Sequence, residues 1–199
     1  GAIVLSIGFG MMNIINLPIV DFRPYKPGNN IQELRTNGEP AKIEYLMSKD
    51  GKEETFVDYP YEGGYKFVKT IEVTPATPPT AKDFYLYEEE SGDDITDIIL
   101  EDNYSFIVIK DINHCDEEDI ININNLIRSL PETENCAILT GNNFTTIREK
   151  LTIQKTELYN LDETVIKAIV RNYPSLLRIE NNLVVSKNMI TESLIKTMK

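Results

Sequence analysis

The sequence predicts a mixed α/β fold, in which helices cover both faces of a sheet and a small β-rich region precedes it. Two observations carry this prediction. The second half of the chain alternates between apolar strand-like runs and helix-like segments, and the first half holds short β-type runs separated by turn signals. Alternating strands and helices form a layered α/β domain, and right-handed crossovers leave few topologies for it.

The strands of the second half are predicted from their apolar runs. Tyr104 to Lys110 has a continuous apolar centre, which is typical of a strand covered on both faces. Residues 135–140 form a second such strand and residues 157–160 a short third one. Residues 175–180 and 183–186 form a hairpin through Asn181-Asn182, because Asn tolerates the positive φ of a tight turn.

The helices between these strands are predicted from apolar spacing and capping residues. Ile120, Ile123, Ile127 and Leu130 recur at three- or four-residue spacing, which indicates an amphipathic helix. Two further helices follow side chains that can accept from the first free backbone N–H groups, Asn143 and Asp162. A last helix is expected over residues 191–198.

Turn and breaker residues organise the first half. Asp50-Gly51 lies between runs at residues 41–47 and 53–58, which predicts a hairpin, and residues 67–73 read as a third strand. Prolines at 75, 78 and 79 mark a linker or domain boundary. Three further prolines, at 18, 24 and 27, exclude a regular helix there and favour an extended path.

Composition excludes several function classes. The chain has 199 residues and a formal net charge of −12, so a broad affinity for nucleic acid or anionic lipid is not expected. Its single His excludes a His-rich zinc site, and two Cys exclude a disulfide-dense scaffold. Residues 83–102 hold nine acidic residues and no basic one, which indicates either a patch for a cation or partner or a solvated edge.

The first residues of the chain are unusually apolar. Residues 2–20 carry no charge, and nineteen helical residues at about 1.5 Å each nearly cross a bilayer core of roughly 30 Å. We expect the end of a membrane helix here; a buried strand or helix of the soluble fold is the alternative. Arg23, Tyr25 and Lys26 would then either anchor at the membrane interface or pack against the small β region.

Two segments of the second half carry a family resemblance. Both segments resemble membrane-tethered extracytoplasmic thioredoxin-like proteins. The first is Asp83-Phe84-Tyr85-Leu86 with Gly92, Ile95, Leu100 and the strand from Phe106. The second is Tyr173-Pro174-Ser175-Leu176-Leu177 with Asn181-Asn182-Leu183-Val184-Val185. The resemblance covers roughly residues 80–199. It implies a thioredoxin-like three-layer domain, with Pro174 in a cis peptide bond beside the active cysteine and Tyr173 and Pro174 presenting backbone to a substrate.

The redox motif of that family is incomplete in this chain. Where the family has Cys-x-x-Cys after the first core strand, this sequence reads Cys115-Asp116-Glu117-Glu118. Disulfide exchange needs one thiolate to attack and a second thiol to resolve the mixed disulfide. Glu118 stands at the resolving position, so the resemblance implies a redox-inactive domain. Catalysis by Cys115 alone is the alternative.

The two thiols and the nearby carboxylates allow other interpretations. Cys136 reads as a small buried residue of a core strand, although a Cys115–Cys136 disulfide stays open. The run from Asp111 lacks the Gly and Glu that an EF-hand requires at positions 116 and 122. We expect no metal and no small-molecule cofactor.

A second resemblance concerns residues 17–30. Leu-Pro-x-x-Asp-Phe-Arg-Pro-Tyr-Lys, with Gly-x-Asn-Ile after it, is similar to the segment after the last membrane helix of DoxX-like membrane proteins of Bacteroides-type bacteria, whose membrane part resembles methylamine-utilisation-type redox proteins. It implies a membrane tether at residues 1–20, a small β-rich domain at 21–78 and a thioredoxin-like domain at 79–199. The chain would be anchored to the cell membrane on its periplasmic side. Its implied partner is the membrane part of the same polypeptide; an envelope protein is the alternative.

Overall fold

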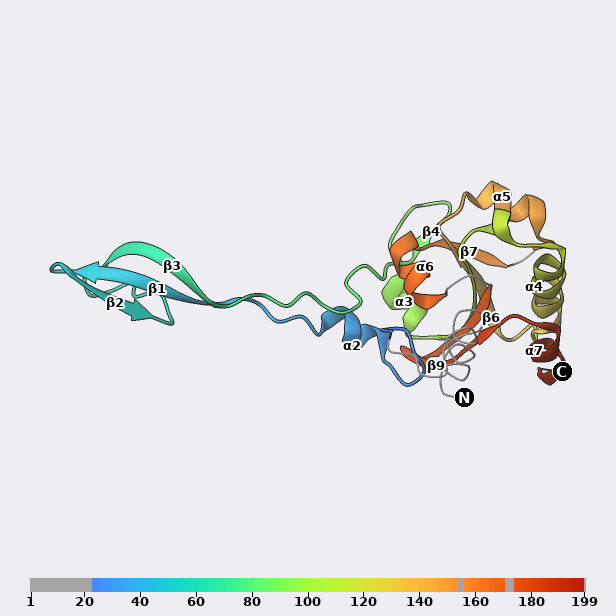
Figure 1. Ribbon diagram of the computed structural model, residues 1–199, viewed down its shortest axis with the longest axis horizontal. Helices are drawn as coiled ribbons and strands as arrows, with labels where there is room; N and C mark the ends of the chain where they lie inside the picture. The colour runs from blue at the N-terminus through green and yellow to red at the C-terminus, as the bar shows by residue number, and fades with distance from the viewer. Residues whose placement is uncertain (1–22, 154–155, 171–173, 199) are drawn as a thin grey trace, which may run out of the picture.

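The computed structural model contains a six-stranded sheet between two layers of helices and a separate three-stranded sheet at the end of a long arm (Figure 1). It describes residues 23–153, 156–170 and 174–198. The elements are α2 (Ile31–Thr36), β1 (Lys42–Lys49), β2 (Lys52–Phe56), β3 (Lys66–Thr74), β4 (Tyr87–Glu88), α3 (Thr96–Leu100), β5 (Asn103–Ile109), the short 3₁₀ helix η1 (Ile112–His114), α4 (Glu117–Ser129), β6 (Asn135–Thr140), α5 (Phe144–Lys150), β7 (Glu157–Asn160), α6 (Glu163–Ile169), β8 (Ser175–Glu180), β9 (Leu183–Met189) and α7 (Glu192–Thr197).

The large sheet has the strand order β4-β7-β6-β5-β8-β9. The neighbours β5, β6 and β7 are parallel, while β8 runs antiparallel to β5 and pairs with β9 in a hairpin. Asn181 and Asn182 turn that hairpin with φ values of 48° and 69°, as the sequence predicts. Since Val108 of β5 pairs with Ser175 of β8, residues just after β5 and just before β8 lie at the same edge of the sheet.

Two apolar cores lie on opposite faces of this sheet. One face packs Phe106 and Val108 against α3 and α6, and the other packs Ile107 and Ile109 against α4, α5 and α7. The last four residues of β5, Phe106 to Ile109, are fully buried, which explains why this part of the strand has no polar alternation. The prediction of a mixed α/β fold with helices on both faces is therefore confirmed.

The segment before the arm belongs to the large sheet. Tyr25 is buried and its ring lies 5.5 Å from that of Phe84. Backbone N–H groups of Gly28 and Ile31 donate to carbonyls of Val184 and Asn182 at 2.8 and 2.9 Å. We expected residues 21–78 to form the small domain, but residues 25–36 pack on the larger unit instead. Tyr25 is thus neither a membrane anchor nor a contact of the small β region.

The arm leaves and rejoins the larger unit at one point. Glu39 and Thr77 exchange two backbone hydrogen bonds of 2.9 Å, and the Asn37 side chain accepts from the Thr80 amide at 2.8 Å. Beyond this base the chain forms the sheet β2-β1-β3, with both pairs antiparallel. Asp50 and Gly51 turn the β1–β2 hairpin with φ values of 51° and 75°, so the predicted Asp-Gly hairpin is confirmed.

The acidic segment 83–102 is structured in part. It contains β4 and α3, and two of its carboxylates form ion pairs, Glu89 with Arg148 and Asp97 with Arg35. Asp94 accepts a hydrogen bond from the Thr96 amide at 3.0 Å, which fixes the start of α3. Part of its charge is therefore used within the fold.

The expected membrane tether, residues 1–20, lies outside the described residues. Among those that are described, no helix combines the length and the apolar character needed to span a bilayer.

Candidate functional site

The candidate site is the edge of the large sheet where β5 and β6 end and α4 begins. After β5, the Asp111 carboxylate accepts from the Asn113 amide at 2.9 Å and so starts η1. Asp116 then caps α4: its side chain accepts from the Asp119 amide at 2.9 Å, and the Asp119 carboxylate accepts from the Asp116 amide at 3.3 Å. This reciprocal cap fixes Cys115 between the two helices.

Cys115 is half-buried and its thiol is held in the neutral form. Burial is the largest cause that raises its pKa to about 11, and the carboxylates of Asp119, Asp111 and Asp116 add to it, while Lys150 opposes them. The thiol lies 3.7 Å from the Asp111 carbonyl oxygen. A helix N-terminus favours a thiolate, but at Cys115 burial and the carboxylates outweigh this effect.

Glu118 does not share a hollow with Cys115. Cys115 lines a hollow of about 420 Å³ with Ile120, Ile121 and Lys150. Glu118 is exposed and lines a different hollow, of about 230 Å³, with Asp119, Asn122 and the Met189–Thr191 segment among others. Cys115 lies just before α4 and Glu118 lies in its first turn, but the two residues face different surroundings, and the other thiol of the chain, Cys136, does not lie beside Cys115.

Pro174 lies at this same edge. It directly precedes β8, is buried, and its carbonyl accepts from the Ile190 amide at 3.0 Å. Ile190 in turn lines the hollow that contains Glu118. Tyr173, and with it the Tyr173–Pro174 peptide bond that the resemblance implies to be cis, lies outside the described residues.

The second thiol is remote from the first. Cys136 pairs with Ser105 near the start of β5, whereas Cys115 follows the end of that strand, and neither cysteine is in a disulfide. Burial raises the pKa of Cys136 to about 12. The structure therefore does not bring the two cysteines together. Cys136 is half-buried and packs against the core, so the predicted buried cysteine is found only in part.

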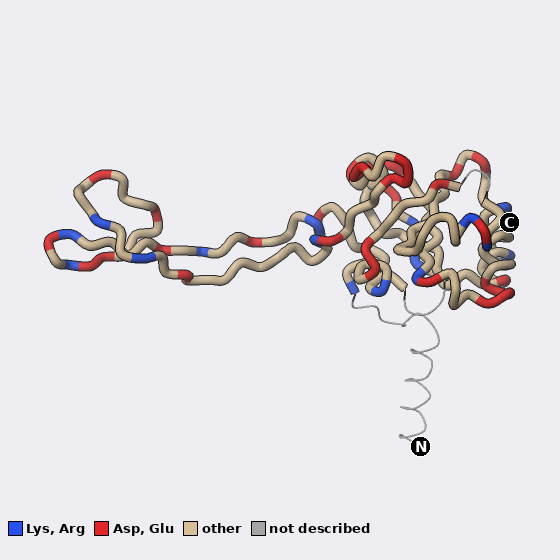
Figure 2. Tube along the Cα trace, turned by 90° about the horizontal axis from the view of Figure 1, so that it is seen from above, with Lys and Arg blue, Asp and Glu red and all other residues tan. Residues whose placement is uncertain are grey.

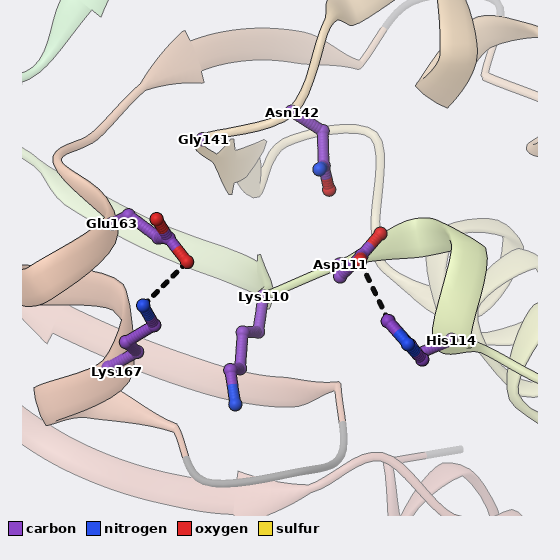
Figure 3. A pocket seen from close by; sticks show the side chains of 7 residues that line it. All are labelled: Lys110, Asp111, His114, Gly141, Asn142, Glu163 and Lys167. Carbon is purple, nitrogen blue, oxygen red and sulfur yellow. Dashed lines mark hydrogen bonds and ion pairs between the residues drawn. The ribbon is translucent and has the colours of Figure 1, made fainter.

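A polar cleft of about 710 Å³ opens beside this site, and sequence reasoning missed it. Its lining comes from the end of β5 and η1, from the residues after β6 and from α6: Lys110, Asp111, His114, Gly141, Asn142, Glu163 and Lys167 (Figure 3). It contains an ion pair of Glu163 with Lys167 at 2.6 Å and a hydrogen bond of 2.7 Å between His114 Nδ1 and the Asp111 carboxylate. Open α/β sheets bind ligands beyond the carboxyl ends of their parallel strands, which is where this cleft lies.

The described side chains that line the polar cleft are charged or polar, and the cysteine beside it, Cys115, has a raised pKa. His114 lies in the polar cleft, while Cys115 lines another hollow, so the two adjacent residues line separate cavities. The Asn113 amide and His114 lower the pKa of Asp111, which stays a carboxylate. Within the described part of the chain, no group of three or more His, Cys, Asp or Glu side chains is arranged to hold a metal ion.

Comparisons with known proteins give a loose structural neighbour. No protein family and no curated protein matches the sequence. The chain is similar to reduced Prx3, a peroxiredoxin from Vibrio vulnificus, solved in complex with H₂O₂. The identity is 8%, the match covers 59% of this chain and 94% of that chain, and the TM-score is 0.35. A likeness at this level leaves the functional assignment to the residues of the site itself.

Proposed function

We propose that this chain is a thioredoxin-like binding module without dithiol chemistry, tethered to the cell membrane on the periplasmic side. Its partner is the membrane part of the same polypeptide. The resemblance of residues 17–30 and 80–199 to DoxX-like and extracytoplasmic thioredoxin-like proteins supports the tether and the fold family. The strand order β7-β6-β5-β8-β9 also supports the thioredoxin-like fold family. Two parallel crossovers join β5, β6 and β7, and the chain then forms the β8–β9 hairpin and the helix α7.

The environment of Cys115 argues against disulfide exchange. The thiol that would attack has its pKa raised to about 11, and the position of the resolving thiol is an exposed glutamate. Nucleophilic cysteines need a lowered pKa and access to their substrate. The alternative of a single-cysteine oxidoreductase at Cys115 would require the opposite environment.

The binding surface of the proposed module is the edge that carries the dithiol in redox-active relatives. Here that edge offers the polar cleft around His114 and Asn142 and the hollow beside Glu118. Charged and amide side chains, together with the backbone near Pro174, can recognise polar segments of a protein partner without covalent chemistry.

The proposal is tested in the full-length polypeptide, with its membrane part present. A photoreactive residue at position 118 should crosslink to that membrane part, and the same residue at Glu132, which is exposed at the opposite end of α4, should not. Cys115→Ser should leave the crosslink yield unchanged. Equal crosslinking from both positions, or loss of the crosslink in Cys115→Ser, would contradict a non-redox binding edge.

A further inference from the structure

Among the residues that the structure describes, no second layer of strands or helices covers the three-stranded sheet at the end of the arm. Of its strand residues only Met47 is buried, while Tyr61 in the β2–β3 connection is 91% exposed and Phe67 is 51% exposed. A sheet with an apolar face is stable when a second layer covers that face. The arm carries this sheet well away from the helices of the larger unit (Figure 1).

The strand register gathers the apolar residues on one side. Tyr45 pairs with Phe56, and Met47 pairs with Phe67; since residues two apart share a face, Ile43 joins them. Three rings of the β2–β3 connection pack over this side. The centre of the Tyr59 ring lies 5.3 Å from that of Tyr45 and 5.1 Å from that of Tyr61. The centre of the Tyr65 ring lies 4.9 Å from that of Phe56. We call the set the aromatic face: Ile43, Tyr45, Met47, Phe56, Tyr59, Tyr61, Tyr65 and Phe67.

The exposed area of the aromatic face suits a protein interface. A whole aromatic side chain has about 150–250 Å² of surface. Multiplying this area by the exposed fraction of each side chain of the aromatic face gives roughly 500 Å² of exposed surface in each copy. Two copies would bury about 1,000 Å² of apolar surface, and at about 65% apolar content for a homodimer interface the total reaches about 1,500 Å². Stable interfaces of standard size bury about 1,200–2,000 Å².

The charged strand residues on the side of the aromatic face differ between its two ends. At the hairpin tip these are Lys49, Lys52 and Glu54, because Lys49 pairs with Lys52 and Met47 pairs with Glu54. The Lys49 ammonium lies 5.3 Å from the centre of the Tyr65 ring. Figure 2 shows acidic and basic positions mixed at the tip of the arm. At the other end, Glu72 pairs with Ile43. Lys49 and Ile43 are six residues apart on β1, or about 20 Å at 3.3 Å per residue. An antiparallel second copy would set the lysines of each tip over Glu72 of the other.

The edge of the sheet is less suited to pairing than its face. Of the two outer strands, β2 begins Lys52-Glu53-Glu54, and β3 carries Lys66 and Lys69. The register of β3 with β1 also shifts twice, which indicates two bulges. Lysines and bulges on an edge strand oppose the addition of another strand.

We propose that the aromatic face binds the aromatic face of a second copy of this chain, antiparallel and face to face. The product is a six-stranded sandwich about a two-fold axis, with aromatic rings at the centre and Lys–Glu contacts at both ends. Such a contact is self-complementary, as a two-fold interface must be, and sheets pack in this way at about 10 Å.

Sedimentation velocity of the whole chain, from low to high micromolar concentration, tests the proposal. Wild type should be dimeric, and Phe67→Lys should raise the dimer dissociation constant at least tenfold. Ile98→Lys is the matched control, because Ile98 is 72% exposed on α3 and lies outside the arm. A monomeric wild type, including one whose aromatic face binds lipid vesicles or another protein, would overturn the proposal, and so would a dimer that survives Phe67→Lys.

A charge exchange tests the antiparallel arrangement while leaving every ring of the aromatic face in the chain. Glu72→Lys alone should weaken the dimer, because the lysine introduced in each copy then faces Lys49 and Lys52 of the other copy. Adding Lys49→Glu and Lys52→Glu to the same chain should restore the wild-type dissociation constant to within about threefold. Weakening without restoration would refute the antiparallel contact even if the chain dimerises.

Discussion

Replacing Ile31 by Ala should destabilise the six-stranded unit although Ile31 precedes the arm by several residues. Ile31 is fully buried in the core that contains Tyr25 and Phe84, and its amide bonds the Asn182 carbonyl. Truncation of a buried isoleucine to alanine costs about 2–5 kcal/mol. For a unit of this size, a loss of about 3 kcal/mol lowers Tm by about 6–12 °C.

Two matched variants separate this effect from a general loss of apolar surface. Met47→Ala removes an equally buried side chain from the three-stranded sheet, so it should leave the main unfolding transition unchanged. Ile98→Ala removes an exposed isoleucine and should change stability by less than about 0.5 kcal/mol. Differential scanning calorimetry, with hydrogen exchange of the α2 amides, measures all three variants.

The reasoning would be refuted by either of two results. An Ile31→Ala variant as stable as wild type would mean that residues 25–36 are not part of the larger core. A Met47→Ala variant that lowers the main transition as much as Ile31→Ala would mean that the arm and the six-stranded unit unfold together.

Three further predictions concern the site and the arm base. Asp116→Ala should lower the free energy of unfolding by about 1 kcal/mol through loss of the α4 cap, and it should speed alkylation of Cys115. Asp116→Asn should also speed alkylation, with less loss of stability. Urea unfolding measures the stability of both variants, and labelling rates measure the alkylation. Because the folded pKa of Cys115, about 11, lies above that of a free thiol, about 8.5, the neutral thiol stabilises the fold at low pH and this contribution is lost as pH rises between those values. Wild type should therefore lose stability relative to Cys115→Ala over that range and not below it, as urea unfolding against pH would record. Gly38→Ala places a Cβ 2.6 Å from Pro79 Cδ. This clash should lower the stability of the arm base by about 1–3 kcal/mol and so accelerate hydrogen exchange of the Glu39 and Thr77 amides. Unchanged exchange would contradict this close approach.

Local signals made much of the fold predictable. Asp50-Gly51 and Asn181-Asn182 mark their hairpins because few residues tolerate positive φ. The apolar run of β5 predicted a strand buried on both faces, and Asn143 and Asp162 cap the helices expected after them. In each case the physical cause lies within a few residues of the element.

The parts that the sequence did not predict depend on distant contacts. The helix α2 is six residues long, and its start is hydrogen-bonded to the β8–β9 hairpin. The local sequence feature that favours this helix is its cap, in which the Asn30 side chain accepts from the Glu33 amide. The polar cleft joins residues from β5, β6 and α6, which only the sheet topology brings together. The absence of a nearby second thiol was readable from Glu118, but the burial of Cys115 was not, because it depends on how η1 and α4 pack.

The alkylation rate of Cys115 against pH tests the central claim most directly, with Cys136 followed separately by peptide mass spectrometry. A pKa of about 11 leaves about one thiol in ten thousand ionised at pH 7, against about three in a hundred for a free thiol. We therefore expect labelling about 300-fold slower than that of a free cysteine at pH 7, with a rate that still rises above pH 9. Fast labelling that reaches its plateau near neutral pH would show an activated thiolate and contradict the assignment of a binding module without thiol chemistry.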